Sequence, residues 1–309
     1  VNDKSFSFKE SEENAIDSND LIYSNLILGL RDYVNKNNFP GVVIGISGGI
    51  DSAFSACVAA DALGPDRVKG ILMPSKFTSN ASNEDADQLG KNLGIGLESI
   101  SIEEIVKAYD ITLDPIFKGA EKDITEENIQ SRARGSLLMA YSNKFGHMVL
   151  TNGNKSEVSV GYSTLYGDMC GGFSVVKDLY KSELYNLAAW RNNCVPSASL
   201  LDKKSVIPQN IITKEPTAEL KPNQMDKDTL PPYEVLDQIL YLLVEKESSI
   251  SEIVDKGFDF EVVTKVQNML YNSEYKRRQA APGVKISERN FGYDRRYPIT
   301  NAFRDSKGS

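Results

Sequence analysis

The chain has 309 residues, a net charge of −8, 40% hydrophobic residues and 25% charged residues, which is the composition of a soluble globular protein and excludes wholesale disorder. No segment approaches the roughly 20 apolar residues of a membrane span, and the acidic balance argues against general nucleic-acid binding. Three cysteines without metal-ligand spacing and one histidine exclude a disulfide scaffold and a multi-histidine metal site. They favour a reducing, cytoplasmic location.

The charge is distributed unevenly along the chain. Residues 274–309 hold nine Lys and Arg against four Asp and Glu, a net charge of +5, which leaves −13 on the other 273 residues. Such a basic segment indicates a local anionic ligand or a subunit contact, or else a solvated tail. Residues 1–20 carry a net charge of −4 without an apolar core, so no signal or transit peptide is expected there. We expect an acidic segment or linker at 1–19, one folded domain at 20–300 and a tail at 301–309.

Apolar periodicity and turn residues predict the secondary structure of the first half. Short apolar runs predict buried strands at 41–46, 68–73, 97–100 and 147–150. The remaining periodic segments predict helices at 20–37, 51–63, 82–94, 102–110 and 126–145. This alternation predicts a three-layer α/β fold with a doubly wound, mostly parallel sheet, whose ligands bind at the carboxyl ends of the strands.

The second half follows a different pattern. Residues 202–232 contain five prolines and are predicted to form a long loop. Helices are predicted at 233–245 and 259–279. The domain is therefore expected to carry a C-terminal extension of helices and loops.

A glycine-rich segment between the first strand and its helix is the strongest functional signal. This glycine loop consists of Gly45, Ile46, Ser47, Gly48, Gly49, Ile50, Asp51 and Ser52. Glycines let a backbone approach a phosphate closely, and a helix N-terminus adds unpaired N–H groups. Asp51 would repel a phosphate unless a cation such as Mg²⁺ lay between them. The loop lacks the Walker ending and the glycine spacing of dinucleotide-binding folds. The alternative is a turn that uses glycines only for its geometry.

The sequence Ser-Gly-Gly-Ile-Asp-Ser at 47–52 resembles the pyrophosphate-binding loop of the N-type ATP pyrophosphatases. That superfamily includes NAD, GMP and asparagine synthetases and some tRNA-thiolating enzymes, and the resemblance implies an adenine nucleotide alpha hydrolase-like fold and cleavage of ATP to AMP and pyrophosphate. Residues 150–172, 216–220 and 275–278 are similar to NAD synthetases. The residues around the last two segments resemble the synthetase domain of the glutamine-dependent, two-domain NAD synthetases.

The resemblance implies roles for residues at matching positions. Asp51 and Glu157 would coordinate Mg²⁺, with Glu157 expected in a loop after the fourth strand. Lys181 would contact the phosphates of ATP. Thr217 would reach ATP from the long loop, and Asn152 stands where the shorter, ammonia-dependent enzymes bind ATP through a threonine.

The resemblance also implies contacts to an anionic dinucleotide. Arg132 matches a substrate-binding arginine, and Tyr275 with Lys276 matches a His-Lys pair of the shorter enzymes. Leu165 and Gly172 replace a lysine and an aspartate of those enzymes, as in the two-domain branch.

Expectations also follow for other basic residues, each close in sequence to one of the matched residues. Arg134, two residues from Arg132 and therefore on a different side of its helix, is expected to form an ordinary salt bridge. Lys177 is expected to share a helix face with Lys181, and its role is left open. The cluster 276–278 is expected to face the anionic dinucleotide.

The expected reaction is the ATP-dependent amidation of nicotinic acid adenine dinucleotide (deamido-NAD) to NAD. The nicotinate carboxylate attacks the α-phosphate of ATP, and ammonia then displaces AMP from the adenylate. The resemblance also implies a homodimer. Two-domain relatives obtain ammonia from an amino-terminal glutaminase, which does not fit into 309 residues whose first motif begins at residue 41. The chain is then an excised domain, or uses free ammonia, or receives it from a separate subunit.

Two alternatives remain. Another ATP pyrophosphatase, GMP synthetase-like or tRNA-modifying, would keep the loop and use a different acceptor, although the negative main body and scattered cysteines argue against a tRNA enzyme. A catalytically silent nucleotide-binding module is the other alternative. Such a module would have no need of Asp51, Glu157 and Lys181 together.

Overall fold

A computed structural model describes residues 17–222 and 224–304, and its strands form one parallel sheet. The strands are β1 (Val42–Gly45), β2 (Val68–Leu72), β3 (Gly96–Ser99), β4 (Met148–Thr151) and β5 (Phe173–Ser174). Their order, β3-β2-β1-β4-β5, confirms the predicted doubly wound sheet. The chain adds β2 and β3 on one side of β1 and then adds β4 and β5 on the other side, so the switch point lies between β1 and β4. A ligand site is expected at that switch point.

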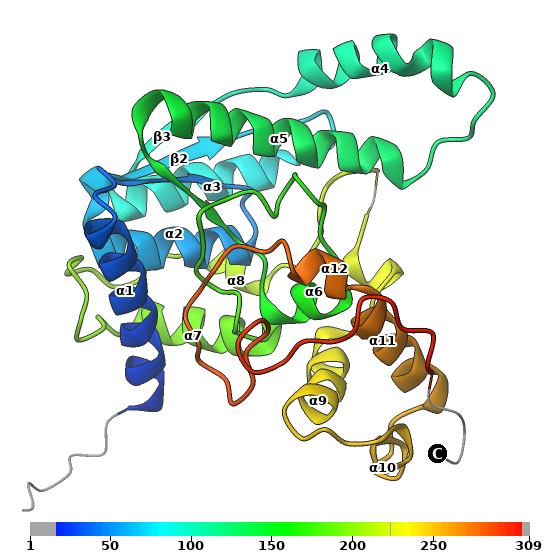
Figure 1. Cartoon of the computed structure of the whole chain (residues 1–309). Helices are drawn as coiled ribbons and strands as arrows, with labels where there is room; N and C mark the ends of the chain where they lie inside the picture. Colours follow the sequence, from blue (N-terminus) through cyan, green and yellow to red (C-terminus); the bar gives the residue numbers. More distant parts are fainter. Residues whose placement is uncertain (1–16, 223, 305–309) are drawn as a thin grey trace, which may run out of the picture.

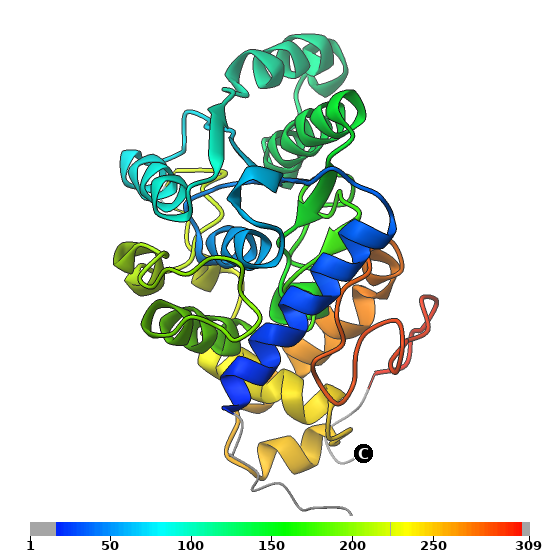
Figure 2. The same ribbon diagram turned by 90° about the vertical axis from the view of Figure 1, so that its left-hand side faces the viewer.

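Helices cover both faces of the sheet (Figure 1, Figure 2). One face is covered by α1 (Ser18–Lys36), α2 (Ile50–Leu63), α3 (Asn80–Leu93), α7 (Lys181–Asn193) and α8 (Gln209–Thr213). The other face is covered by α4 (Glu103–Phe117) and α5 (Ile124–Phe145). A helical lobe beside the sheet contains α6 (Lys155–Val160), α9 (Tyr233–Val244), α10 (Ile250–Val254), α11 (Phe260–Asn272) and α12 (Glu274–Arg277).

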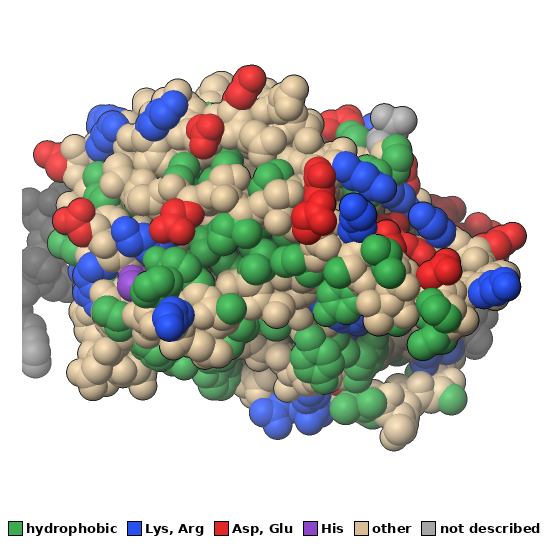
Figure 3. Space-filling model, turned by 90° about the horizontal axis from the view of Figure 1, so that it is seen from above, with side chains coloured by type: hydrophobic (Ala, Val, Ile, Leu, Met, Phe, Trp, Pro, Cys, Tyr) green, Lys and Arg blue, Asp and Glu red, His purple; other side chains and the backbone are tan. Residues whose placement is uncertain are grey.

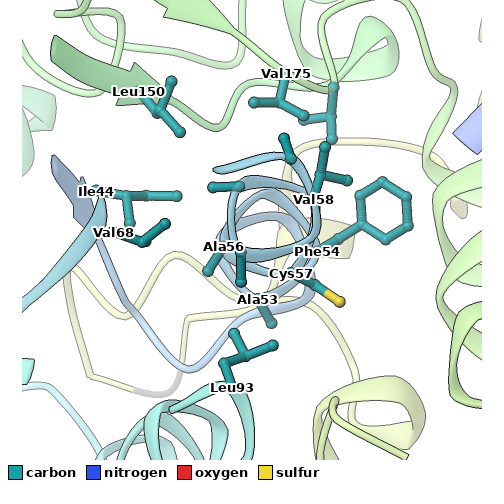
Figure 4. Close-up of a cluster of buried hydrophobic side chains, with 14 of the residues drawn as sticks. Ile44, Ala53, Phe54, Ala56, Cys57, Val58, Val68, Leu93, Leu150 and Val175 are labelled. Carbon is teal, nitrogen blue, oxygen red and sulfur yellow. The ribbon is translucent and has the colours of Figure 1, made fainter. Parts of the chain in front are cut away.

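The alternation of side chains along β1 explains how one strand serves both layers. Val42 and Ile44 belong to the main core, whereas Val43 belongs to a second cluster with Leu138 of α5. Helix α2 lies at the centre of the main core and is buried along nearly its whole length, because many of its side chains are small enough for close packing. Figure 4 shows its core residues Ala53, Phe54, Ala56, Cys57 and Val58.

Most predicted elements are confirmed within two or three residues, and the differences have local causes. The helix predicted at 82–94 begins at Asn80, because Ser79 caps it by accepting a hydrogen bond from the Ser82 amide (3.1 Å). The helix predicted to end at residue 110 continues to Phe117, through Pro115. The helix predicted at 259–279 is divided at Ser273 into α11 and α12.

Other differences lie in segments of weak periodicity. Helices α6 and α10 and the two-residue strand β5 were not predicted. The predicted loop 202–232 contains α8 and a short 3-10 helix, Asp226–Asp228. Within the described part of the chain, no helix has the length and hydropathy to cross a membrane. The predicted segment 1–19 lies outside the described residues except for 17–19, and the tail 301–309 except for 301–304.

Two ion pairs join helices α2 and α7 at positions ten residues apart in each helix. Near the N-terminal ends, the Lys181 ammonium lies 2.5 Å from Asp51 Oδ2. Further along, Arg191 donates to both carboxylate oxygens of Asp61, at 2.8 and 2.9 Å, and the Tyr23 hydroxyl donates to Asp61 at 2.7 Å. Asp61 and Arg191 are fully buried, so each is the counterion on which the other depends.

Substitution of Arg191→Met should lower the free energy of unfolding by about 3–5 kcal/mol, because it leaves the Asp61 carboxylate buried without its cation. The double variant Asp61→Asn/Arg191→Met should recover part of that loss, since it removes both charges. Urea denaturation measures both effects.

The matched control is Lys36→Met, which removes an exposed ion pair with Asp32. This change should alter the free energy of unfolding by less than about 1 kcal/mol. Equal losses in Arg191→Met and Lys36→Met would contradict the assigned importance of the buried pair.

Candidate active site

A cavity lies at the carboxyl edge of the sheet, around the ends of β1 and β4, where the strand order reverses. Its walls include the N-terminal ends of α2, α6 and α7 and the segment 214–220. The predicted site residues that line it are Gly45, Ile46, Ser47, Gly49, Ile50, Asp51, Ser52, Asn152, Glu157, Lys181 and Thr217. Arg132, Tyr275 and Lys276 are not among its lining residues.

The glycine loop is held in a conformation that one of its glycines requires. Gly48 has a φ of +76°, and a Cβ there would lie 2.3 Å from the carbonyl oxygen of Ser82. Ser52 Oγ accepts from the Ser47 amide (3.2 Å) and donates to the carbonyl of Gly49 (3.0 Å). The two serines therefore brace the loop internally, in addition to any bond they could make to a ligand.

Asp51, Glu157 and Lys181 meet at the centre of the cavity. The Lys181 ammonium lies 2.5 Å from Asp51 Oδ2 and 3.2 Å from Glu157 Oε1. Glu157 is in the first turn of helix α6, so its predicted placement in a loop was wrong. The cause is Asn154, which caps α6 by accepting from the Glu157 amide (2.9 Å) and donates to Asp51 Oδ1 (2.7 Å).

Burial and mutual charge decide the protonation of this group. The side chain of Lys181 is 2% exposed, whereas those of Asp51 and Glu157 are 19% and 17% exposed, so the carboxylates face the cavity. Burial, and then the charge of Asp51, raises the pKa of Glu157 above its usual range. Burial acts to lower the pKa of Lys181, but the carboxylates of Asp51 and Glu157 outweigh that effect and raise it.

Asp51 and Glu157 supply part of a binding site for a divalent cation. Both carboxylates converge on the Lys181 ammonium, and carboxylate oxygens are the protein ligands that Mg²⁺ prefers. Among the residues that the structure describes, no cluster of three or more His, Cys, Asp or Glu is arranged to hold a metal. The protein therefore offers two ligands, and a bound ion would complete its shell with water and substrate oxygens.

Two basic residues lie where sequence reasoning did not expect them. Lys177 precedes α7, which begins only at Lys181, so the predicted shared helix face was wrong. Lys177 lines the cavity, and its ammonium donates to the carbonyl of Ala281 (2.7 Å). Arg134 also lines the cavity, where Nε donates to the carbonyl of Met73 (3.0 Å) rather than to a carboxylate. Burial lowers the pKa of Arg134 to about 10.

The residues matched to dinucleotide binding lie beside the cavity. Arg132 is exposed and donates to the carbonyl of Leu165 (3.2 Å), and Tyr275 is also exposed. Lys276 donates to the carbonyls of Gly161 (2.7 Å) and Ser163 (2.6 Å). Arg132 and Lys276 are thus both attached to the segment 161–165.

The basic cluster 276–278 does not face a ligand as a unit. Arg277 is buried, pairs with Glu274 and donates to the carbonyls of Ser159 and Leu270. The expectation that this cluster turns three charges toward a dinucleotide was therefore wrong for Arg277. The reason is that residues 274–277 form the short helix α12, in which neighbouring side chains point to different sides.

Two polar residues that were matched to ATP binding, Asn152 and Thr217, form hydrogen bonds within the protein. Asn152 donates to the carbonyl of Gly45 (3.2 Å), and its Oδ1 is buried without a hydrogen-bond partner among the described residues. Thr217 donates to the carbonyl of Gln224 (2.5 Å), which closes a small turn in the long loop. Asn152 Oδ1 is therefore an acceptor that a ligand can satisfy.

Sequence reasoning gave no role to four carboxylates that line the cavity, Asp168, Glu215, Glu219 and Asp226. Burial raises the pKa of Asp168 to about 6. Asp226 accepts from the hydroxyls of Tyr233 (2.9 Å) and Tyr162 (3.3 Å). Asp168 follows the pair Tyr166-Gly167 within a segment already matched to the family, which was the available signal. Asp226 lies in the segment after 216–220 that resembles the two-domain synthetases, so the same signal was available for it.

The chain is similar to known proteins over most of its length. The NAD synthase family model matches residues 22–280. Glutamine-dependent NAD(+) synthetases from Thermotoga maritima and Acinetobacter baylyi are 55% and 50% identical over 280 and 290 residues, or 91% and 94% of this chain. The chain spans about half the length of these curated relatives, 47% and 52% respectively.

Solved structures give the same result. A glutamine-dependent NAD⁺ synthetase from Acinetobacter baumannii, in complex with ADP, is 45% identical with a TM-score of 0.63, covering 94% of this chain and 51% of that one. An NH3-dependent NAD synthetase from Campylobacter jejuni, in complex with the nitrate ion, is 28% identical with a TM-score of 0.64, covering 82% and 93%. The fold is the predicted adenine nucleotide alpha hydrolase-like fold. The chain belongs to the NAD synthase family.

Proposed function

We propose that this chain catalyses the ATP-dependent amidation of deamido-NAD to NAD, with release of AMP and pyrophosphate. The observation that carries the proposal is the meeting of Asp51, Glu157 and Lys181 beside the glycine loop, in a chain of the NAD synthase family. The Acinetobacter baumannii relative was solved with ADP, which supports an adenine nucleotide in this cavity.

In this proposal the glycine loop and the N-terminal end of α2 bind the phosphates of ATP through backbone N–H groups. Asp51 and Glu157 hold Mg²⁺, which supplies positive charge to the phosphate oxygens when bound. Lys181 stabilises the charge that develops on the leaving pyrophosphate. Asn152 and Thr217 contact the nucleotide. No protein nucleophile is needed, so the chain acts by positioning and by charge stabilisation.

We assign the dinucleotide to the side of the cavity formed by residues 161–165. Arg132 and Lys276 are both anchored there by backbone carbonyls, and each provides a positive charge for an anionic substrate. Tyr275 is 43% exposed beside Lys276 and is available to stack on a ring. Three free thiols, at Cys57, Cys170 and Cys194, support a cytoplasmic location.

The family relatives differ in their ammonia source, since some are named glutamine-dependent and another NH3-dependent. We infer that ammonia is the nucleophile for this chain and that glutamine serves when a glutaminase domain or subunit is joined to it. The test is NAD formation from deamido-NAD, ATP and Mg²⁺ with either ammonium or glutamine. We expect NAD to form with ammonium and not with glutamine. Tight ATP binding without product from either source would favour another acceptor or a silent module.

Lys181→Met should lower kcat by about 100-fold or more, because it removes a preorganised cation from the leaving group. Steady-state kinetics with ammonium measure this change, and thermal unfolding of the same sample shows whether the variant is folded. Lys246→Met is the control, since that lysine forms an exposed pair with Glu288 remote from the cavity lining. A folded Lys181→Met protein with normal turnover would refute the assigned role.

We also propose a homodimer formed through the outer face of α4 and α5. Figure 3 shows hydrophobic side chains across this face, and α4 has no buried residue. Ile111 and Ile116 are 67% and 76% exposed, an extent that a second copy of the chain would cover.

The double variant Ile111→Asp/Ile116→Asp should shift the protein from dimer to monomer without loss of folding, because neither side chain contributes to the described core. Sedimentation velocity measures the oligomeric state, and far-UV circular dichroism checks the fold. A dimer that persists unchanged in the variant would place the interface elsewhere.

A further inference from the structure

The cavity contains a lysine that forms no ion pair with the described residues. Lys181 pairs with Asp51 and Glu157, and Lys214 pairs with Asp85 (3.2 Å). Lys177 lines the same cavity but forms no ion pair within 4.0 Å among the described residues, and its hydrogen-bond acceptor is a backbone carbonyl, that of Ala281.

The acidic residue that follows Lys177 in the sequence, Asp178, is engaged elsewhere. Asp178 accepts from the amides of Ile286 (2.7 Å) and Ser287 (2.8 Å) and from the Ser287 hydroxyl (2.8 Å). It also lies 3.3 Å from the buried ammonium of Lys155. Asp178 therefore acts on Lys177 electrostatically but forms no ion pair with it, since both of its oxygens bond elsewhere.

The position of Lys177 is fixed by packing rather than by charge. A Cβ on Gly283 would lie 3.3 Å from the Cβ of Lys177, so the base of the lysine packs closely against this glycine. The Ser174 amide donates to the carbonyl of Pro282 (2.8 Å), which fastens the same segment to the end of β5. Packing therefore fixes the base of the side chain, and the hydrogen bond to the Ala281 carbonyl (2.7 Å) holds the ammonium.

A desolvated ammonium without a counterion is unfavourable, and burial lowers the pKa of Lys177. An anionic ligand in the cavity would remove that penalty. Arg134 is the other cavity cation without an ion pair. A carboxylate acts electrostatically on each of the two, Glu219 on Arg134 and Asp178 on Lys177. The place of Lys177 in the sheet is what makes it the candidate for a ligand other than ATP.

The place of Lys177 in the sheet indicates which reactant it meets. It follows β5, which is separated from β1 by β4, so its strand lies roughly 10 Å from the strand that carries the glycine loop. ATP phosphates occupy the glycine loop in the proposed function, together with Lys181. The anionic reactant on the other side of β4 is then the dinucleotide.

We propose that Lys177 is a substrate-binding residue that contacts an anionic oxygen of deamido-NAD, either of the nicotinate carboxylate or of its phosphates. This inference rests on the proposed function. It adds a binding cation that is separate from the ATP-binding loop and from the Arg132 and Lys276 side of the cavity.

The test compares Lys177→Met, which removes the charge, with Lys177→Arg, which keeps it. The control is Lys203→Met, because Lys203 also donates to a single backbone carbonyl, that of Asn92 (2.6 Å), but is exposed and outside the cavity lining. Steady-state kinetics with ammonium give kcat and the KM for each substrate. Calorimetry gives the Kd of deamido-NAD without ATP.

We expect Lys177→Met to raise the KM and Kd of deamido-NAD by about 10-fold or more, while the KM of ATP changes by less than about 2-fold. The KM and Kd of deamido-NAD should stay within about 3-fold of the wild-type values in Lys177→Arg. Lys203→Met should have the wild-type values. Unchanged deamido-NAD binding in a folded Lys177→Met protein, an effect on ATP instead, or an equal defect in Lys177→Arg would overturn the inference.

The outcomes also separate this inference from the proposed function. If the wild-type chain forms no NAD yet binds deamido-NAD through Lys177, the proposed reaction fails and the binding assignment stands. If the wild type forms NAD and Lys177→Met binds deamido-NAD normally, the binding assignment alone fails.

Discussion

The ammonium of Lys181, buried between the carboxylates of Asp51 and Glu157, is the contact on which the arrangement of the site depends. It joins the first turns of three helices, α2, α6 and α7, at one point. Because an isolated charge is costly in such surroundings, any displacement of one helix would leave one of these groups unpaired. The second pair, Asp61 with Arg191, holds α2 and α7 together further along. The two pairs restrict how far these helices can slide past each other.

The helical lobe takes part in this constraint through helix α6. Lys155, two residues before Glu157, is buried and pairs with Asp178 and with Glu245 at the end of α9. It also donates to the carbonyl of Arg289 (2.9 Å) in the C-terminal segment. The position of Glu157 therefore depends on parts of the chain more than 80 residues away.

The alternation of four strands with helices and the glycine loop could be predicted, because both depend on local sequence: short apolar runs between turn residues, and glycines between a strand and a helix. The side-chain partners could not. Glu157 was expected in a loop because the cap by Asn154 was overlooked, and Lys177 was placed on a helix that begins four residues later. Arg277 looked like a ligand residue, yet tertiary contacts bury it. Spacing in sequence identifies basic residues but does not show whether a carboxylate, a carbonyl or a ligand meets them.

Negative charge gathers on one side of the cavity and a cation lies on the other. This separation gives a physical reason for placing ATP on the first side and the dinucleotide on the second. Asp51, Glu157 and Asp226 lie around one ammonium, and Asp226 adds to the negative field at Glu157. The Lys181 ammonium also lies 5.2 Å from the centre of the Tyr233 ring, whose hydroxyl donates to Asp226. This region has excess negative charge, so a triphosphate would bind there with a divalent cation more readily than alone. Across β4, Lys177 forms no ion pair with any described residue, and in the proposed site that side favours an anion that arrives without a metal.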